Sequence, residues 1–551
     1  MRALGLILIA VCGILAQAPR TPAPTAEAAR GSISGIVRVQ GTGDPVRDAD
    51  VSARRPGAKA VAAKTDQQGR YTLPLLEPGS YTVAAVVPPK NGVGFGAQAS
   101  RPVTLQPDQD LTGIDMQVPM PCQISGKVMD ENGEPLADIL VALVAREYSY
   151  GALRYVFAGA DATDDQGKYA IARATPGRAL LLLAMKRQMR LPSVSNAPDD
   201  PKLRRPVPVA TYYPGSPDPE GGEPLVLRTG ESREGVNIRM RKAVPYCLEA
   251  VVSGTADISS LGFSIGLQRP TSGASGNGAT YMGMPGGKVP ADGKVRLCEL
   301  YPADYELEVT HWGGPMEGPD FLGILPVTIS DRDIAGARVT ALPKIPLPGE
   351  VELYGGAPAT PLETELTIDL RSLTRTIYPT AKSYIPGQFS FDGLVPDEYS
   401  LEVRGLPAGY YLKDVTYGGQ SVLRRSLRIG SAPADAALRL VVARDGGHIA
   451  AKVANGGGNP VGNANVLLIP ASAGSEAELA AFLQSGVTDQ NGTWTSGALA
   501  PGKYFALASP DAMDKSPESI GKLWRAHTQA EEIELQPNQT AQVSLDVKGI
   551  E

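Results

Sequence analysis

The stretch Thr65-Asp66-Gln67-Gln68-Gly69-Arg70-Tyr71-Thr72-Leu73, followed by Glu77-Pro78-Gly79-Ser80-Tyr81, decides the fold. Asp at the start and Gly at the end of a four-residue turn favour type I geometry. Tyr71 and Leu73 then alternate with polar neighbours, as a half-buried strand requires. Pro78-Gly79 predicts a second turn, after which Tyr81 and Val83 resume the alternation. We call this turn–strand–turn–strand pattern the anchor stretch.

The anchor stretch recurs four times, in the segments 163–177, 292–305, 387–399 and 488–504. Its glycines are spaced at intervals of 98, 126, 94 and 105 residues. Solenoids and propeller blades repeat at roughly 20–50 residues, whereas an independent seven-strand sandwich needs about 100. The sequence therefore predicts an all-β fold, a tandem array of five Ig-like or prealbumin-like β-sandwich domains.

The predicted domains follow from the closing strands, each of which leads directly into a new opening strand. Their expected bounds are 31–121, 122–245, 246–345, 346–443 and 444–551. The last domain also contains two short helical inserts, from Glu476 to Leu483 and from Pro517 to about His527, the second with Ser516 as N-cap. Ile520, Leu523 and Trp524 share one face of the second helix, which indicates packing. Trp494 stands at the position of Tyr71 and is expected in the core.

The second unit contains Ile124-Ser125-Gly126-Lys127-Val128, then Asn132-Gly133-Glu134-Pro135-Leu136, then the anchor stretch from Thr163 to Tyr169. This succession resembles the carboxypeptidase regulatory-like domain, and units one and five follow it too. The resemblance implies a transthyretin-like sandwich, grouped with carbohydrate-binding-like folds and found in secreted and surface proteins of bacteria. It implies a fold and no catalytic residue.

The amino-terminal segment predicts export. Arg2 precedes an apolar run from Ala3 to Ala16, and Ala16-Gln17-Ala18 is a small-x-small cleavage site, so residues 1–18 are typical of a signal peptide. Residues 19–30 are expected to be a flexible leader. No later segment is apolar over the roughly 20 residues that a membrane span needs. We expect a periplasmic, extracellular or cell-surface protein.

Composition and motifs narrow the function. The formal net charge is -6 and the basic residues are dispersed, which excludes the basic footprint of a nucleic-acid-binding protein. The three histidines lie in no zinc-peptidase motif, and no nucleophile elbow or phosphate-binding loop occurs. One Asp per anchor turn provides too few oxygens for calcium. We expect no enzyme activity, cofactor or metal.

The candidate ligand-binding residues are aromatics of the second unit, Tyr148, Tyr150, Tyr155, Tyr212 and Tyr213. Aromatic side chains on loops stack on sugar rings or pack against a partner protein. The alternative is that they cap the sandwich and bury loop backbone. Two functions stay open: a non-catalytic binding protein whose partner is a glycan or an envelope protein, and a structural stalk, scaffold or adhesion module.

A disulfide is predicted between Cys247 and Cys298 in the third unit. An oxidising compartment permits it, and the alternation of both strands places the two thiols on the side away from the inner layer. The sequence does not tell whether the strands are neighbours. Cys122 has Ala172 where a partner would stand and is expected to be a free thiol.

Overall fold

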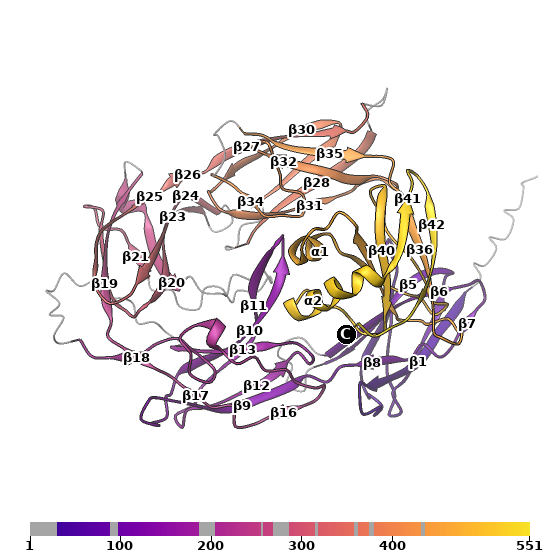
Figure 1. Cartoon of the computed structure of the whole chain (residues 1–551), viewed down its shortest axis with the longest axis horizontal. Coiled ribbons are helices and arrows are strands. Elements are labelled where there is room, and N and C mark those ends of the chain that lie inside the picture. Colours follow the sequence, from indigo (N-terminus) through magenta and orange to yellow (C-terminus); the bar gives the residue numbers. More distant parts are fainter. Residues whose placement is uncertain are drawn as a thin grey trace, which may run out of the picture.

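The computed structural model describes residues 30–88, 97–186, 204–254, 257–267, 286–314, 318–356, 362–373, 379–430 and 436–550. They form five β-sandwiches that follow one another around a ring, and the fifth returns to the first (Figure 1). The predicted signal peptide lies outside the described residues. No helix in the described part of the chain is long and apolar enough to cross a membrane.

The first two sandwiches each contain two main sheets. In the first, one sheet comprises β4 (Arg70–Leu76), β1 (Gly31–Val39), β7 (Asp110–Leu111) and β8 (Met116–Val118), and the other β3 (Val61–Lys64), β2 (Asp50–Arg54), β5 (Gly79–Val87) and β6 (Ala97–Leu105). In the second, one sheet comprises β12 (Lys168–Ala174), β9 (Cys122–Met129), β16 (Ser232–Arg233) and β17 (Ile238–Arg239). The facing sheet comprises β11 (Ala152–Ala162), β10 (Ile139–Ser149), β13 (Leu180–Lys186) and β15 (Thr211–Tyr212). A small extra ribbon pairs β14 (Val207–Pro208) with β18 (Lys242–Ala243).

The third and fourth sandwiches carry larger sheets. The third pairs β22 (Lys294–Leu300), β19 (Tyr246–Ser253) and β25 (Ile334–Thr340) with a sheet of β21 (Gly286–Lys288), β20 (Gly262–Leu267), β23 (Ala303–Gly314), β24 (Gly318–Ile329) and β26 (Leu342–Pro343). The fourth packs β30 (Gly387–Leu394), β27 (Ile345–Leu353), β35 (Leu438–Ala443), β32 (Tyr411–Tyr417) and β33 (Gln420–Ser421) on β29 (Thr380–Ile385), β28 (Leu362–Ser372), β31 (Glu398–Arg404) and β34 (Leu427–Arg428).

The fifth sandwich adds the two helices. Its sheets are β39 (Thr493–Thr495), β36 (His448–Ala454) and β42 (Thr540–Asp546), and β38 (Gln484–Val487), β37 (Asn465–Pro470), β40 (Gly502–Ser509) and β41 (Glu531–Leu535). The helices are α1 (Glu476–Phe482) and α2 (Pro517–Ala526). The Ser516 hydroxyl accepts from the Ser519 amide at 3.2 Å, which is the cap expected for α2.

All five sandwiches share one arrangement around the opening strand. Each opening strand pairs antiparallel with the strand of the anchor stretch and parallel with the closing strand. Because this pairing is parallel, the closing strand of each unit ends beside the end of the opening strand of the same unit. The predicted all-β tandem array is therefore confirmed.

Hydrogen bonds that repeat from unit to unit fix the turn of the anchor stretch. The Thr65 hydroxyl accepts from the Ala49 amide at 2.9 Å and donates to the Val46 carbonyl at 2.7 Å. The Asp66 carboxylate accepts from the amides of Gln68 and Arg70. The same pattern of bonds occurs around Thr163 and Asp164 and around Thr488 and Asp489. Turn formation thus accounts for the Thr-Asp pair of the repeat.

The Ser-Gly pair of the opening strand has a packing reason. Gly126 lies opposite Tyr169 in the β9–β12 register, and the Tyr169 hydroxyl donates to the Val236 carbonyl at 2.7 Å. A Cβ added to Gly126 would lie only 1.9 Å from that carbonyl oxygen. Because Gly126 has no side chain, the Val236 carbonyl can approach β9 closely enough to accept the hydrogen bond from Tyr169. Gly35, Tyr71 and Ile114 repeat this arrangement in the first sandwich.

The second turn of the anchor stretch holds another repeated bond. In four sandwiches the tyrosine three residues after the proline donates its hydroxyl to the carbonyl four residues before it, at 2.8 to 3.0 Å. These tyrosines are Tyr81, Tyr305, Tyr399 and Tyr504. Ig-like sandwiches use a comparable tyrosine corner. The second sandwich has Ala179 at this position and lacks the bond.

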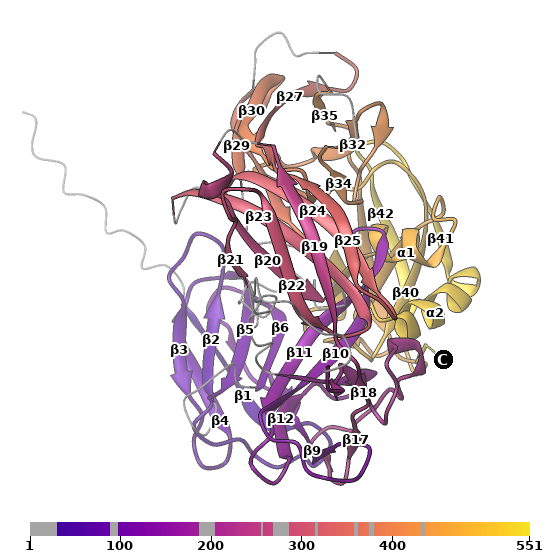
Figure 2. The ribbon, with the colours of Figure 1, turned by 90° about the vertical axis from the view of Figure 1, so that its left-hand side faces the viewer.

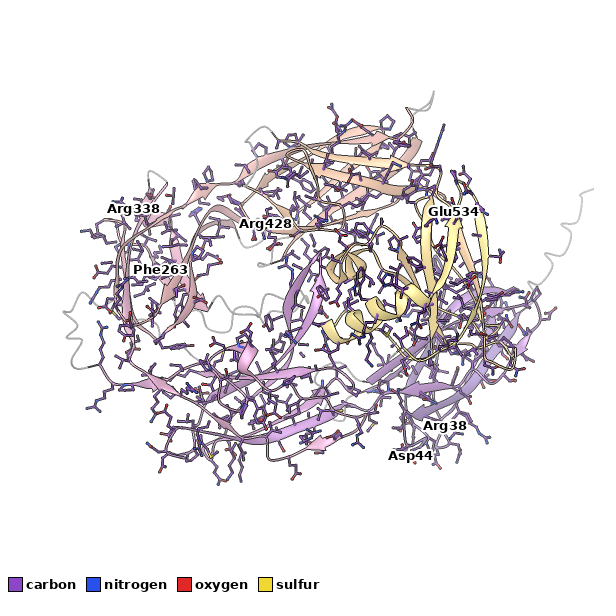
Figure 3. All side chains as sticks on the ribbon, viewed as in Figure 1. Arg38, Asp44, Phe263, Arg338, Arg428 and Glu534 are labelled. Carbon is purple, nitrogen blue, oxygen red and sulfur yellow. A yellow bond between two sulfur atoms is a disulfide. The ribbon has the colours of Figure 1, made fainter. Side chains whose placement is uncertain are left out.

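Each sandwich has a core of its own between its sheets. Phe263 lies in the third core, for example, whereas Arg338 and Glu534 are exposed (Figure 3). β37 is apolar on both faces because Val466 and Leu468 face the fifth core while Leu467 and Ile469 pack under the helices. Ile520 and Leu523 of α2 are fully buried in this second cluster, and Trp524 packs against it. Trp494 packs against the fifth core.

The ring closes through a contact between the fifth and first sandwiches. The side-chain amide of Gln490 accepts from the Thr104 backbone amide at 3.1 Å and donates to the Thr104 carbonyl at 2.7 Å. The Thr104 hydroxyl also donates to Asp489 at 3.3 Å. The side-chain amide of Gln490 thus bonds to both backbone groups of Thr104, as the backbone of a neighbouring strand would. Figure 2 shows the ring from the side, with the first sandwich (indigo) at the left and the fifth (yellow) at the right.

The domain bounds stay a prediction, and limited proteolysis of the whole chain tests them. We expect stable fragments whose ends fall near residues 121, 245, 345 and 443, because each unit has its own core and the linkers between cores are short. Ile345 already belongs to β27, so the third cut is expected at or just before Lys344. A stable fragment that ends inside an anchor stretch would contradict the scheme.

Candidate ligand-binding site

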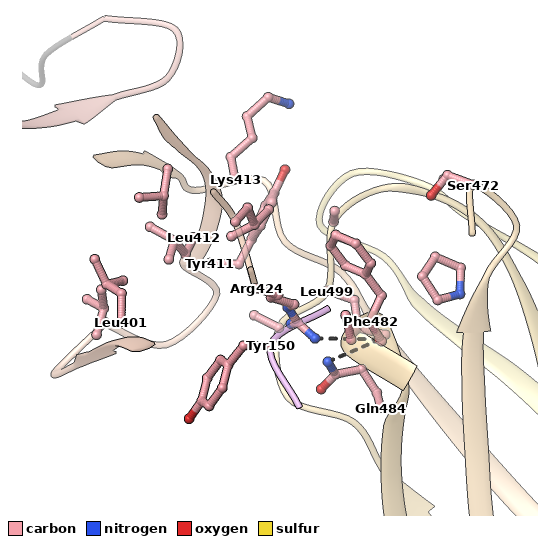
Figure 4. A pocket seen from close by; sticks show the side chains of 18 of the residues that line it. Tyr150, Leu401, Tyr411, Leu412, Lys413, Arg424, Ser472, Phe482, Gln484 and Leu499 are labelled. Carbon is pink, nitrogen blue, oxygen red and sulfur yellow. Dashed lines mark hydrogen bonds between the residues drawn. The ribbon is translucent and has the colours of Figure 1, made fainter. Parts of the chain in front are cut away.

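A cavity of about 1340 Å³ lies where the second, fourth and fifth sandwiches meet (Figure 4). The second sandwich contributes the tip of the β10–β11 hairpin, residues 147–150. The fourth contributes residues of β31, β32 and the turn that contains Arg424, and the fifth contributes the end of α1, the segment 498–504 and Lys515. We call this space the junction cavity.

The β10–β11 hairpin reaches the cavity because it is long and clamped on both sides. The Tyr148 backbone amide donates to the Lys515 carbonyl at 2.7 Å, and the Tyr148 hydroxyl donates to Glu476 of α1 at 3.3 Å. On the other side Arg154 forms an ion pair with Glu398 of β31 at 2.8 Å, and both side chains are largely buried. Burial alone would raise the pKa of Glu398, but hydrogen bonds from Arg154 and Ser426 outweigh it and lower the pKa.

Four cationic side chains line the cavity, Lys413, Arg424, Lys503 and Lys515, together with the carboxylates Glu147 and Glu402. Arg424 and Lys515 are both exposed to solvent. Burial lowers the pKa of Arg424. Burial and then repulsion from Arg424 lower the pKa of Lys515, while the charge of Glu147 partly offsets both. The tyrosines Tyr411 and Tyr504, both buried, form part of the wall, and burial raises the pKa of each.

The five candidate tyrosines do not form one cluster. Tyr148 and Tyr150 line the junction cavity, and Tyr150 is the more exposed, at 38 %. Tyr212 is completely buried and packs with Val144, Leu181 and Leu183, and Tyr155 packs against the same group. Tyr213 packs against the core of the second sandwich. Tyr155, Tyr212 and Tyr213 do not line the junction cavity, which leaves Tyr148 and Tyr150 as the two that a ligand there could touch.

The cysteines lie as follows. Cys247 and Cys298 form a disulfide between the neighbouring strands β19 and β22, with Cα atoms 4.0 Å apart. The Arg204 guanidinium forms an ion pair with Asp333 at 2.7 Å and lies 3.5 Å from the Cys247 sulfur. Cys122 is a buried free thiol and donates to the Arg228 carbonyl at 2.8 Å. Across the described ranges, no three His, Cys, Asp or Glu side chains gather as a metal site would require.

Sequence reasoning missed Arg424, Lys515 and the cavity itself. These residues come from segments far apart in the chain, and neither stands in a motif. A local signal existed only for the hairpin, whose alternating aromatics drew attention to Tyr148 and Tyr150.

Comparison with known proteins identifies one domain. Residues 32–119, the first sandwich, match the carboxypeptidase regulatory-like domain. No curated protein matches the chain. Similar solved structures include a streptococcal ancillary pilin, with 10% identity over 57% of this chain and 99% of that chain at a TM-score of 0.19. The TIE protein of Bacillus anthracis shares 11% identity over 77% of this chain and 73% of its own, with a TM-score of 0.16.

The major pilin subunit BcpA of Bacillus cereus shares 11% identity over 55% of this chain and 99% of its own, with a TM-score of 0.14. At these identities and TM-scores, no statement about the function of this chain rests on the three structures. The first sandwich is thus similar to a known domain family.

Proposed function

We propose that the chain is a non-catalytic, exported binding protein of the cell envelope that holds a glycan in the junction cavity. The observation that carries this proposal is the cavity itself, which is lined by tyrosines and cations from three sandwiches. Ligand sites form preferentially at domain interfaces, where a few polar groups sit among apolar and aromatic walls. The carboxypeptidase regulatory-like first domain supports a role in binding rather than catalysis.

Tyr150 is the residue that tests this proposal. Its side chain lines the cavity and is partly exposed at the hairpin tip, whereas Tyr148 also packs against the helices of the fifth sandwich. Replacing Tyr150 by Ala should therefore remove ligand contact without loosening a core. Stacking on an aromatic ring is worth about 1 kcal/mol, so we expect affinity to fall several-fold for Tyr150→Ala and further for the Tyr148→Ala, Tyr150→Ala pair.

The measurement is binding of the mature chain and its variants to a glycan array. Tyr384→Ala is the matched control, because Tyr384 is 50 % exposed but lies on β29, outside the cavity lining. We expect the control to bind as the wild type does. Equal binding by Tyr150→Ala and the wild type would place the ligand elsewhere, and an array without any signal would contradict the proposal.

A structural scaffold is the second candidate, favoured by the contacts between sandwiches. Arg154–Glu398 ties the second sandwich to the fourth, Arg425–Glu478 ties the fourth to the fifth at 3.0 Å, and Gln490 ties the fifth to the first. Such contacts would hold five domains in a fixed arrangement. A scaffold needs the contacts but not an open cavity, so Tyr150→Ala would leave its function intact.

A further inference from the structure

We propose that the ligand of the junction cavity carries carboxylates, which makes it an acidic oligosaccharide such as a uronate oligomer, and that Arg424 and Lys515 bind these carboxylates. This inference rests on the proposed function and adds the chemical class of the glycan. It follows from the charges of the cavity wall, from the groups that those charges already contact, and from the size of the space.

Arg424 has contacts that orient it without neutralising it. Its guanidinium donates to the Phe482 carbonyl at 3.5 Å and, with the Gln484 amide turned so that its oxygen faces Arg424, to that oxygen at 2.9 Å. It also lies over the Phe482 ring, 5.6 Å from the ring centre. All three partners are uncharged, so the positive charge remains available (Figure 4). A guanidinium fixed in this way is suited to bind a carboxylate.

Lys515 lines the same cavity as Arg424 and adds a second positive charge, which the charge of Arg424 repels. Glu147 is the carboxylate whose charge favours protonated Lys515, but it is already paired with Arg178 at 2.6 Å. Two like charges that line one cavity repel each other unless an anion lies between them. A ligand carboxylate would relieve this repulsion, whereas a neutral sugar would not.

The size and walls of the cavity favour an oligosaccharide over other anions. At about 1340 Å³ the cavity exceeds the roughly 300–1,000 Å³ of drug-sized sites, so an inorganic anion would fill little of it. Tyr150 offers an aromatic surface of the kind that stacks on sugar rings. Acidic peptide motifs are recognised by clusters of Arg, so an acidic peptide is included among the probes below. Arg424 and Lys515 lie outside every strand, so a peptide bound to them would not extend a sheet.

The experiment is isothermal titration of the whole mature chain with trigalacturonate and, separately, with its fully methyl-esterified form. The two probes share the sugar rings and differ in charge. We expect trigalacturonate to bind at least about tenfold more tightly, since a charge-assisted hydrogen bond contributes about 1.4 kcal/mol or more and each 1.4 kcal/mol is tenfold. Lys515→Gln and Arg424→Gln should each weaken trigalacturonate binding about tenfold and leave the ester unchanged.

Lys452→Gln is the control, because Lys452 is an exposed lysine of the same sandwich on β36, outside the cavity lining. If Arg424→Gln unfolds the turn, Arg424→Lys is measured in its place. Because Arg424→Lys keeps the charge, it should bind trigalacturonate more tightly than Lys515→Gln does. Equal affinity for both probes, or wild-type affinity of the Lys515→Gln and Arg424→Gln variants, would overturn the inference.

Two further probes distinguish other ligands. Inorganic phosphate or a tetra-aspartate peptide binding as tightly as trigalacturonate would also overturn it. A neutral glycan bound through Tyr150 would overturn the charge inference while the proposed function stands. Absence of binding to any glycan would overturn both.

Discussion

Gly126→Ala should destabilise the second sandwich by about 3 kcal/mol. The added Cβ would lie 1.9 Å from the Val236 oxygen and 2.5 Å from its carbonyl carbon, so the closing segment must move. Overpacking of this kind costs about 1–3 kcal/mol, and the shift would also weaken the bond from the Tyr169 hydroxyl, worth about 1 kcal/mol. Hydrogen exchange of peptides from β9 and β12 should therefore accelerate roughly a hundredfold.

Gly215→Ala is the control for this variant. A Cβ at Gly215, in the same sandwich, would meet the Arg239 carbonyl oxygen at 3.5 Å, which is ordinary van der Waals contact. We expect exchange in β9 and β12 to stay at the wild-type rate in Gly215→Ala. Wild-type protection in Gly126→Ala would show that the glycine is not required by packing.

Removing the disulfide with Cys247→Ser and Cys298→Ser should cost the third sandwich about 4 kcal/mol. The bond closes a loop of 51 residues, and the chain-entropy model gives about this value for such a loop. The loss should appear as faster hydrogen exchange in β19 and β22 and leave the other cores unchanged. A reductant should lower the stability of the wild type to that of the double variant and have no effect on the variant.

Thiol titration of the unfolded, unreduced mature protein tests the same bond. With the signal peptide removed, and with it Cys12, three of the four cysteines remain. We expect one reactive thiol, that of Cys122. Three reactive thiols would mean that the bond does not form.

The sequence predicted what local interactions determine. The Thr-Asp turn of the anchor stretch and the Ser516 cap of α2 involve residues within a few positions of one another or in neighbouring strands of one unit. Their residue types therefore indicate their structure directly. The regular spacing of the anchor glycines likewise reflected one sandwich per repeat.

The aromatic candidates show where pattern reasoning fails. Tyr212 lies in an edge segment beside β13, and β10 and β13 are buried on both faces, so alternation could not distinguish an inward from an outward ring. For the disulfide, alternation gave the side of each strand, but adjacency of β19 and β22 came only with the structure.

The junction cavity depended on the arrangement of whole domains. Tyr150, Arg424 and Lys515 belong to three sandwiches, and their meeting requires the ring to close. The sequence predicts each sandwich from its own repeat, but it contains no repeated signal for the contacts between sandwiches. Those contacts are made by single side chains such as Arg154 and Gln490.

Ring closure also has a mechanical consequence. Each sandwich is held by a ladder of backbone hydrogen bonds around an apolar core, whereas the described contact between Gln490 and Thr104 consists of a few polar bonds of about 1 kcal/mol each. A force that separates the first sandwich from the fifth would break this contact before any sandwich unfolds. The first sandwich would then swing away from the fifth, while contacts such as Arg154–Glu398 and Arg425–Glu478 keep the second, fourth and fifth together. The contact would form again when the load is removed, so the chain would extend reversibly at this one joint.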